Sequence, residues 1–189
     1  YYPKMQVAAP FSPVTGPRLL ARTGPDSDDA RLTLLRALET VCQKLEVSSV
    51  HVTFCTEREH QIMGIADWIP RVGRQFHWHN RGYETFDDFL GALTSRKRKM
   101  IRKERRQVSD QGIRVRPLTG DEIKPEHWDA FYQFYVDTYD RKWGYPYLTR
   151  EFFEAAQARL GHKIVLVMAN MDGLPVAGAL NLKGSDALY

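Results

Sequence analysis

Basic and aromatic side chains crowd one short stretch of the sequence, DTYDRKWGYPYLT. The crowded residues are Tyr139, Arg141, Lys142, Trp143 and Tyr145. Arg and Lys can pair with phosphate or carboxylate, and aromatic rings can stack on a base or a sugar. The stretch therefore predicts a substrate-binding pocket, in which the two cations hold an anionic group. Cations at the end of a helix also satisfy the helix dipole, so a purely structural interpretation stays open beside it.

Two histidines alternate with aromatic residues in the segment QFHWHN. On a strand, the side chains of His77 and His79 would share one face. A metal site needs further ligands, and none of the right kind lies near in the sequence, so we favour hydrogen-bonded histidines and expect no metal site. His77 is the candidate catalytic residue, as an acceptor for a proton.

A glycine turn follows the first apolar segment, within PFSPVTGPRLL. Backbone amides in such a turn could cradle an anion, which makes Thr15, Gly16 and Arg18 candidate cofactor-binding residues. The turn matches neither the P-loop pattern nor GxGxxG. A plain connecting loop is the favoured interpretation.

The positive charge of the chain is concentrated in residues 94–106, which hold eight basic residues and one acidic residue within a chain of net charge +4. Candidate polyanion-binding residues there are Arg96, Lys97, Arg98, Lys99, Arg102 and Lys103. Such a helix could lie along the phosphates of a nucleic acid. A solvated charged face is the default interpretation of such a run.

The surrounding segment, residues 85–108, is predicted to form one long helix that begins at Thr85. Cations near its C-terminal end, among them Arg105 and Arg106, would complement the helix dipole. Apolar residues recur at three- and four-residue steps and predict a buried stripe: Phe86, Phe89, Leu90, Leu93, Met100 and Ile101.

The remaining periodicities predict a mixture of helices and strands, hence an α/β fold of the α+β kind with mixed sheets. Helices are expected at residues 30–47, 57–66, 128–142 and 150–160. Strands are expected at residues 5–9, 49–55, 72–79, 113–118, 163–169 and 175–182. In the aromatic helix 128–142, four residues fall on one line, with Phe134 adjoining: Trp128, Phe131, Tyr135 and Thr138.

The composition is that of a globular protein, with 189 residues, 43% of them hydrophobic and 26% charged. No apolar run approaches the roughly 20 residues that span a bilayer, and a cytoplasmic location is expected. Cys42 and Cys55 lack CxxC spacing and are expected to be buried thiols. Because the chain begins without Met and ends at the opening of an expected strand, we expect a fragment of a longer protein.

Three segments carry a resemblance to a known family: YYPKMQVAAPFSPVTGPRLL, QFHWHNRGYETFDDFLGALTSRKRKMIRKERR and FYQFYVDTYDRKWGYPYLTREFF. They resemble the FemAB-like subgroup of the Fem-like family, named for peptidoglycan biosynthesis and recognition, within the GNAT acyltransferase superfamily. The resemblance implies tandem GNAT-like domains joined by the long basic helix. Residues 1–111 would be the C-terminal half of a first domain, ending in that helix, and residues 112–189 the N-terminal half of a second.

The same resemblance implies an N-acyltransferase or aminoacyltransferase. It would move an acyl or aminoacyl group from acyl-CoA or aminoacyl-tRNA to an amine acceptor, such as a peptidoglycan precursor peptide, without a covalently bound cofactor. Positioning of donor and acceptor can supply much of the rate, so a conspicuous catalytic residue is not required. Two alternatives stay open: a nucleic-acid-binding module that binds tRNA through the basic helix, and a non-catalytic interaction domain.

Overall fold

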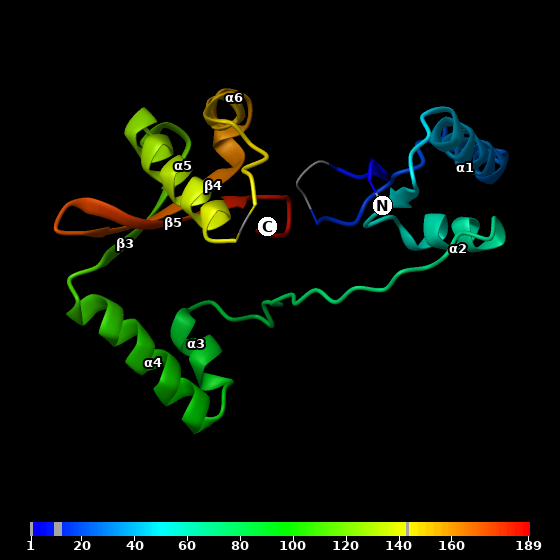
Figure 1. Ribbon diagram of the computed structural model, residues 1–189. Helices are drawn as coiled ribbons and strands as arrows, with labels where there is room; N and C mark the ends of the chain where they lie inside the picture. Colours follow the sequence, from blue (N-terminus) through cyan, green and yellow to red (C-terminus); the bar gives the residue numbers. More distant parts are fainter. Residues whose placement is uncertain (1, 10–12, 143) are drawn as a thin grey trace. The chain divides into compact units, whose positions relative to one another are not determined.

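The computed structural model describes residues 2–9, 13–142 and 144–189, and it contains both helices and strands (Figure 1). The mixed content confirms the expected α+β class. The chain divides into two compact units, Tyr1–His79 and Asn80–Tyr189. The basic helix thus groups with the second unit, whereas the sequence analysis assigned it to the first. The GNAT-like identity of each unit stays a prediction. In the described part of the chain, no helix is both long and apolar enough to cross a membrane.

The first unit combines two helices with a small parallel sheet. Its elements are β1 (Met5–Val7), α1 (Ser27–Lys44), β2 (Val50–Val52) and α2 (Glu57–Ile65). β1 pairs with β2 in parallel. Leu35 of α1 and Ile62 of α2, each at most 2% exposed, pack with Leu19 and Met63 in a common core. The predicted capping box is confirmed, because Thr56 accepts from the Glu59 N–H while the Glu59 carboxylate accepts from the Thr56 N–H.

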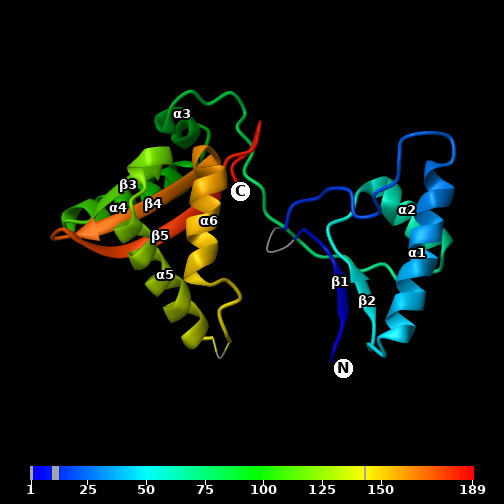
Figure 2. The ribbon, with the colours of Figure 1, turned by 90° about the horizontal axis from the view of Figure 1, so that it is seen from above.

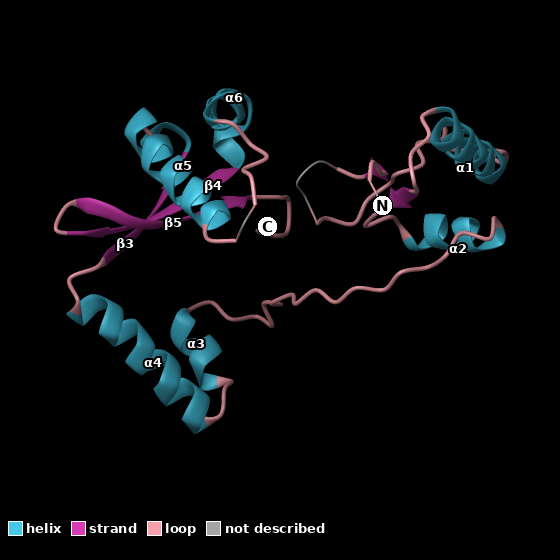
Figure 3. Cartoon of the chain, in the orientation of Figure 1, coloured by secondary structure: helices cyan, strands magenta, loops and turns pink. Residues whose placement is uncertain are grey.

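The prediction of a strand at residues 72–79 is wrong. This segment is extended but belongs to no strand, and Val72 and Phe76 are 96% and 91% exposed. Figure 3 shows it as part of the long loop between α2 and α3. A segment with alternating apolar and polar residues forms a strand only if a neighbouring strand supplies backbone hydrogen bonds. In the described residues, no strand pairs with this segment.

The prediction of a single helix at residues 85–108 is also wrong, because this segment forms two helices. α3 (Phe86–Gly91) is capped by Thr85, and α4 (Ser95–Asp110) is capped by Thr94, whose hydroxyl accepts from the Lys97 N–H. Gly91 is a poor helix former, and Thr94 adopts the extended conformation of an N-cap. Together these residues end one helix and begin another.

The break also changes the predicted apolar stripe. Leu90 is buried at 2% exposure, but Phe86 and Met100 are both 43% exposed, and α4 contains no buried residue. The last turn of α4 holds no basic residue. The expected buried stripe and the expected compensation of the C-terminal dipole are therefore both wrong for this segment.

The second unit also contains a three-stranded antiparallel sheet of order β3-β4-β5. Its strands are β3 (Arg114–Thr119), β4 (Ile164–Met171) and β5 (Leu174–Leu182), and its helices are α5 (Pro125–Asp140) and α6 (Arg150–Leu160). Short 3-10 turns at Gly120–Glu122 and Gly161–Lys163 flank the helices. The strand expected at residues 163–169, the hairpin that follows and the helix at 150–160 are confirmed.

α5 and α6 cover one face of this sheet (Figure 2). Alternate residues of β4, namely Ile164, Leu166 and Met168, are buried against Trp128 of α5 and Phe153 of α6. Asp172 and Gly173 join β4 to β5 with φ angles of 52° and 81°, as a tight hairpin turn requires. This packing fixes the orientation of α5 over β5.

Candidate functional site

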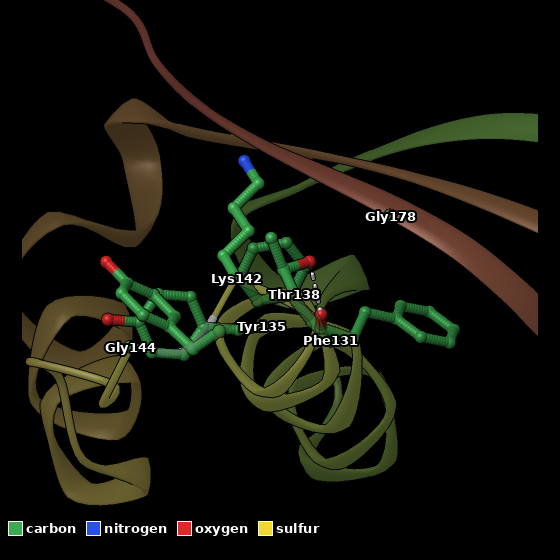
Figure 4. Close-up of a pocket in the computed structure, with 8 residues that line it drawn as sticks. Phe131, Tyr135, Thr138, Lys142, Gly144 and Gly178 are labelled. Carbon is green, nitrogen blue, oxygen red and sulfur yellow. Dashed lines mark hydrogen bonds between the residues drawn. The ribbon is translucent and has the colours of Figure 1, made fainter.

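A pocket of about 440 Å³ lies between the C-terminal half of α5, the turn that follows it and β5 (Figure 4). Its volume falls within the range of small-molecule sites, roughly 300–1,000 Å³. The lining residues are mostly aromatic or small: Phe131, Phe134, Tyr135, Thr138, Tyr139, Lys142, Gly144 and Gly178. Five of them, from Phe131 to Tyr139, follow one another at steps of one or three residues and so share one face of α5, and Lys142 follows in the turn after the helix.

Two of the five residues predicted to bind substrate, Tyr139 and Lys142, line this pocket. Arg141 and Tyr145 are exposed and are not among the lining residues, and Tyr145 is 88% exposed. Trp143 lies outside the described residues. The structure thus separates the neighbours Arg141 and Lys142, which the sequence analysis placed together.

Glycine at position 178 sets the floor of the pocket. A Cβ atom added there would lie 3.0 Å from Cδ2 of Phe131 and 3.1 Å from Sδ of Met168. Cβ contacts this short force neighbouring atoms to move. A residue without a side chain at this position therefore lets the rings of α5 approach β5 closely.

Tyr135 ties the wall of the pocket to the chain that follows it. Its hydroxyl oxygen accepts hydrogen bonds from the backbone N–H groups of Tyr147 and Leu148, both at 3.1 Å. The loop between α5 and α6 is thereby fastened to the helix that lines the pocket.

Tyr139 presents a neutral phenol. Its ring meets the rings of Tyr135 and Tyr147 edge to face, with centroids 5.0 Å and 5.8 Å apart. The hydrogen bond with Tyr135 raises the pKa of Tyr139, and burial and the neighbouring tyrosines act in the same direction. The phenol therefore keeps its proton at neutral pH.

The turn after α5 folds back onto Tyr139. The N–H groups of Lys142 and Gly144 both donate to the Tyr139 carbonyl oxygen, at 2.9 Å and 3.2 Å. A Cβ on Gly144 would lie 3.0 Å from Cδ1 of the Tyr139 ring. Gly144 therefore lets the turn pass directly over that ring, which closes this side of the pocket.

Lys142 is the one cation among the residues that line the pocket. Figure 4 shows its side chain extended, with the ammonium nitrogen clear of the aromatic rings. In the described part of the chain, no carboxylate forms an ion pair with it. The pocket can thus hold an apolar group against the rings while Lys142 pairs with a carboxylate or phosphate.

The pocket residues that the sequence analysis did not assign to a site are Phe131, Phe134, Tyr135, Thr138, Gly144 and Gly178. The helical periodicity of α5 already marked four of them, but periodicity alone does not distinguish a pocket wall from a packed face. Gly178 carried no local signal, because its place in the pocket depends on the pairing of β4 with β5.

The candidate cofactor loop uses its polar groups internally. The Gly16 N–H donates to the Phe54 carbonyl at 3.0 Å, and the Arg18 N–H donates to Oε1 of Glu59 at 2.6 Å. The Arg18 guanidinium donates to the carbonyls of Val14, Pro17 and Thr53. Thr15 is exposed. The arrangement is that of a connecting loop, and its Gly16 and Arg18 amides do not face an open anion site.

Glu59 is 2% exposed and supplies negative charge beneath this loop. Burial raises its pKa, but hydrogen bonds from the N–H groups of Leu19, Thr56 and Arg18 outweigh burial, so the pKa lies below its ordinary value. A carboxylate at this position repels a phosphate. Glu59 therefore stabilises the loop, and a role of Thr15, Gly16 and Arg18 in cofactor binding stays a prediction.

His77 lies in the extended segment before α3 and is exposed. Its Nε2 is 3.1 Å from Oε1 of Gln75, and its ring centroid is 6.3 Å from that of His79. No group of three or more potential metal ligands occurs among the described residues. The role of His77 as a proton acceptor stays a prediction.

The six candidate polyanion-binding residues lie on α4 and divide into two groups. Arg98 donates a hydrogen bond to the Leu93 carbonyl, in the turn between α3 and α4, and Arg102 donates one to the Asp87 carboxylate of α3. The other four are exposed and form no ion pair with a described residue: Arg96, Lys97, Lys99 and Lys103.

Comparisons with known proteins place the chain in a family. No curated protein and no solved structure matches it. One family model, FemAB_like, described as peptidoglycan biosynthesis/recognition, matches residues 1–189. Since the match covers the whole sequence, the chain belongs to the FemAB-like family of peptidoglycan biosynthesis and recognition.

Proposed function

We propose that this chain forms part of an N-acyltransferase or aminoacyltransferase, and that the α5 pocket holds its acceptor, a peptidoglycan precursor peptide. The family connects the chain with peptidoglycan. The observation that carries the proposal is the pocket itself, in which apolar rings lie beside one exposed cation, Lys142, that forms no ion pair with a described residue. Such a site suits a peptide with aliphatic side chains and a free carboxylate.

The aromatic walls would pack against the aliphatic part of the peptide, and Lys142 would pair with its carboxylate. Tyr139 adds an uncharged ring to the wall, since its hydrogen bond with Tyr135 raises its pKa and keeps the phenol neutral. These contacts orient the acceptor amine. Orientation supplies much of the rate in such a transfer, because two bound reactants meet at high effective concentration.

In the transfer, the unprotonated amine nitrogen forms a bond to the donor carbonyl carbon. The bond from that carbon to the sulfur of CoA or to the ribose oxygen of tRNA breaks, and the proton that the amine loses passes, directly or through water, to that sulfur or oxygen, which leaves as a thiol or a hydroxyl. Thioester and aminoacyl ester are both suitable donors for this chemistry. The family membership does not distinguish them, and the first experiment compares them.

The natural full-length protein is incubated with a precursor peptide and, separately, with acetyl-CoA and with aminoacyl-tRNA, and the peptide mass is measured. A mass increase with one donor identifies the reaction. No increase with either donor contradicts the transferase and favours a non-catalytic interaction domain.

The pocket is tested in the same assay by comparing Lys142→Gln with Arg141→Gln. These neighbouring substitutions remove the same charge, one inside the pocket and one outside it. Lys142→Gln is expected to raise the KM for the peptide about twofold to fivefold, as for an exposed ion pair, with kcat nearly unchanged. An equal effect of the two substitutions would contradict the assignment of the pocket.

A further inference from the structure

Three arginines of α4 hold this helix against α3. Nη2 of Arg98 donates to the Leu93 carbonyl at 3.1 Å, and Nη2 of Arg102 donates to Oδ1 of Asp87 at 3.2 Å. The guanidinium of Arg105 lies 4.1 Å from the centroid of the Phe86 ring, which is a cation–π contact. Figure 3 shows the two helices joined by a short turn. These contacts fix which side of α4 faces away from α3.

Four other cations form a separate row on α4. The row, called here the basic stripe, consists of Arg96, Lys99, Lys103 and Arg106. Steps of three, four and three residues bring them onto one helical face, about 110° around the helix from the three arginines that contact α3. The stripe extends over about 15 Å at 1.5 Å per residue. All four residues are exposed, and none forms an ion pair with a described residue.

The stripe does not stabilise the helix that carries it. Like charges three and four residues apart repel each other. The first turn of α4 contains no acidic residue, so Arg96 lies near the positive end of the helix dipole, and the last turn contains no basic residue. The repulsion among the cations and the repulsion of Arg96 by the dipole are both unfavourable, and both are offset when an anion binds along the stripe.

We propose that the basic stripe binds the phosphate backbone of a double-helical nucleic acid, without reading its sequence. A row of exposed cations over about 15 Å complements a duplex, which carries about one negative charge per 1.7 Å of its axis. Arg and Lys contact phosphates in any sequence, so this binding is non-specific. The surface is separate from the α5 pocket and does not depend on the transferase proposal.

An anionic membrane fits the surface less well. A helix that lies in a membrane surface buries an apolar face between flanking cations. On α4, the charged residues Lys97 and Glu104 lie among the apolar residues Met100, Ile101 and Val108, on the side away from the stripe. Only charge could therefore attract α4 to an anionic membrane. The phosphates of a duplex, in contrast, lie in a row that matches the row of cations.

The test measures binding of the natural full-length protein to duplex DNA at several salt concentrations. Four phosphate contacts predict a slope of about −3.6 for log K against log salt, at about −0.9 per contact. Lys99→Gln removes one contact and should reduce the slope to about −2.7 and weaken binding about eightfold at 0.1 M salt. Lys97→Gln removes the same charge from the other side of α4 and should bind like the unchanged protein.

Circular dichroism of both variants checks that α4 remains helical. Equal losses in Lys99→Gln and Lys97→Gln would show that only net charge matters, and would overturn the stripe. Absence of duplex binding at low salt would overturn the proposal outright. If vesicles with anionic phospholipid bind while the duplex does not, the partner is a lipid surface and the nucleic-acid proposal is wrong.

Discussion

Gly178 of β5 lies against Phe131 of α5 so closely that a Cβ atom on Gly178 would be 3.0 Å from Cδ2 of the ring. Both residues line the α5 pocket. The close approach of the Phe131 ring therefore requires glycine at position 178, because the ring occupies space that a larger residue there would need.

Gly178→Ala should force the Phe131 ring or the Met168 side chain to shift, since the added Cβ would lie 3.0 Å from Cδ2 of Phe131 and 3.1 Å from Sδ of Met168. Overpacking of this kind costs about 1–3 kcal/mol of folding free energy. Denaturant unfolding measures the cost, and peptide binding should weaken as the rings enter the pocket. Gly64→Ala is the control, because a Cβ there meets no atom within 4 Å. Similar stability of the two variants would contradict the close packing at Gly178.

Tyr135→Phe removes the oxygen that accepts from the N–H groups of Tyr147 and Leu148. We expect a loss of about 1–3 kcal/mol, at about 0.5–1.5 kcal/mol for each hydrogen bond. Hydrogen exchange at the Leu148 amide should accelerate. In the control Tyr132→Phe, the lost hydroxyl has no hydrogen bond to a described residue, and Leu148 exchange should not change. Slow exchange of Leu148 in Tyr135→Phe would show that other contacts hold the loop.

Glu59 should make the stability of the first unit depend on pH. Its folded-state pKa lies below 4.5, the ordinary value of a glutamate, so the carboxylate stabilises the fold above pH 4.5, and this contribution is lost as the pH falls through the folded-state pKa. Glu59→Gln should cost about 1–3 kcal/mol at neutral pH, since a buried charged acceptor is removed. The difference between the two proteins should shrink in acid. A difference that does not change between pH 7 and pH 3 would contradict this role.

Thr94 should determine where α4 begins, because its hydroxyl accepts from the Lys97 N–H. Thr94→Ala is expected to cost about 1 kcal/mol, the usual effect of losing an N-cap. Chemical shifts of residues 94–98 report whether the first turn frays. Unchanged shifts in Thr94→Ala, together with unchanged stability, would show that the α3 contacts alone fix the start of the helix.

The sequence predicted those elements whose signals are local. The bounds of α6 agree with the expected helix at residues 150–160, because its apolar residues recur regularly and Thr149 precedes them. The capping box at Thr56 and Glu59 was predicted from two residues. In such cases the contacts that form the element lie within one or two turns of the chain.

The incorrect predictions concern features that depend on distant partners or on competing local signals. The alternation at residues 72–79 could not show that no described strand pairs with this segment. The apolar periodicity at residues 85–108 predicted one continuous helix, and the start of α4 after Thr94 was missed. Thr and Ser are nevertheless common residues at the beginning of a helix. Periodicity alone does not decide between one continuous helix and two helices in succession.

The pocket residues were predicted only in part, because some have a local sequence signal and others depend on contacts between distant segments. Tyr139 and Lys142 were identified because aromatic and basic residues crowd the end of α5. Gly178 was missed, because only the sheet brings β5 next to this helix. Arg141 was grouped with Lys142 by adjacency, but adjacent residues of a turn face different directions.

The most direct test of the proposed acceptor site is equilibrium binding of the precursor peptide to the unchanged protein, to Lys142→Gln and to Arg141→Gln, measured by calorimetry. The α5 pocket predicts that Kd rises about twofold to fivefold for Lys142→Gln and stays unchanged for Arg141→Gln. Equal affinity of all three proteins for the peptide, or weaker binding only in Arg141→Gln, would contradict the pocket as the acceptor site.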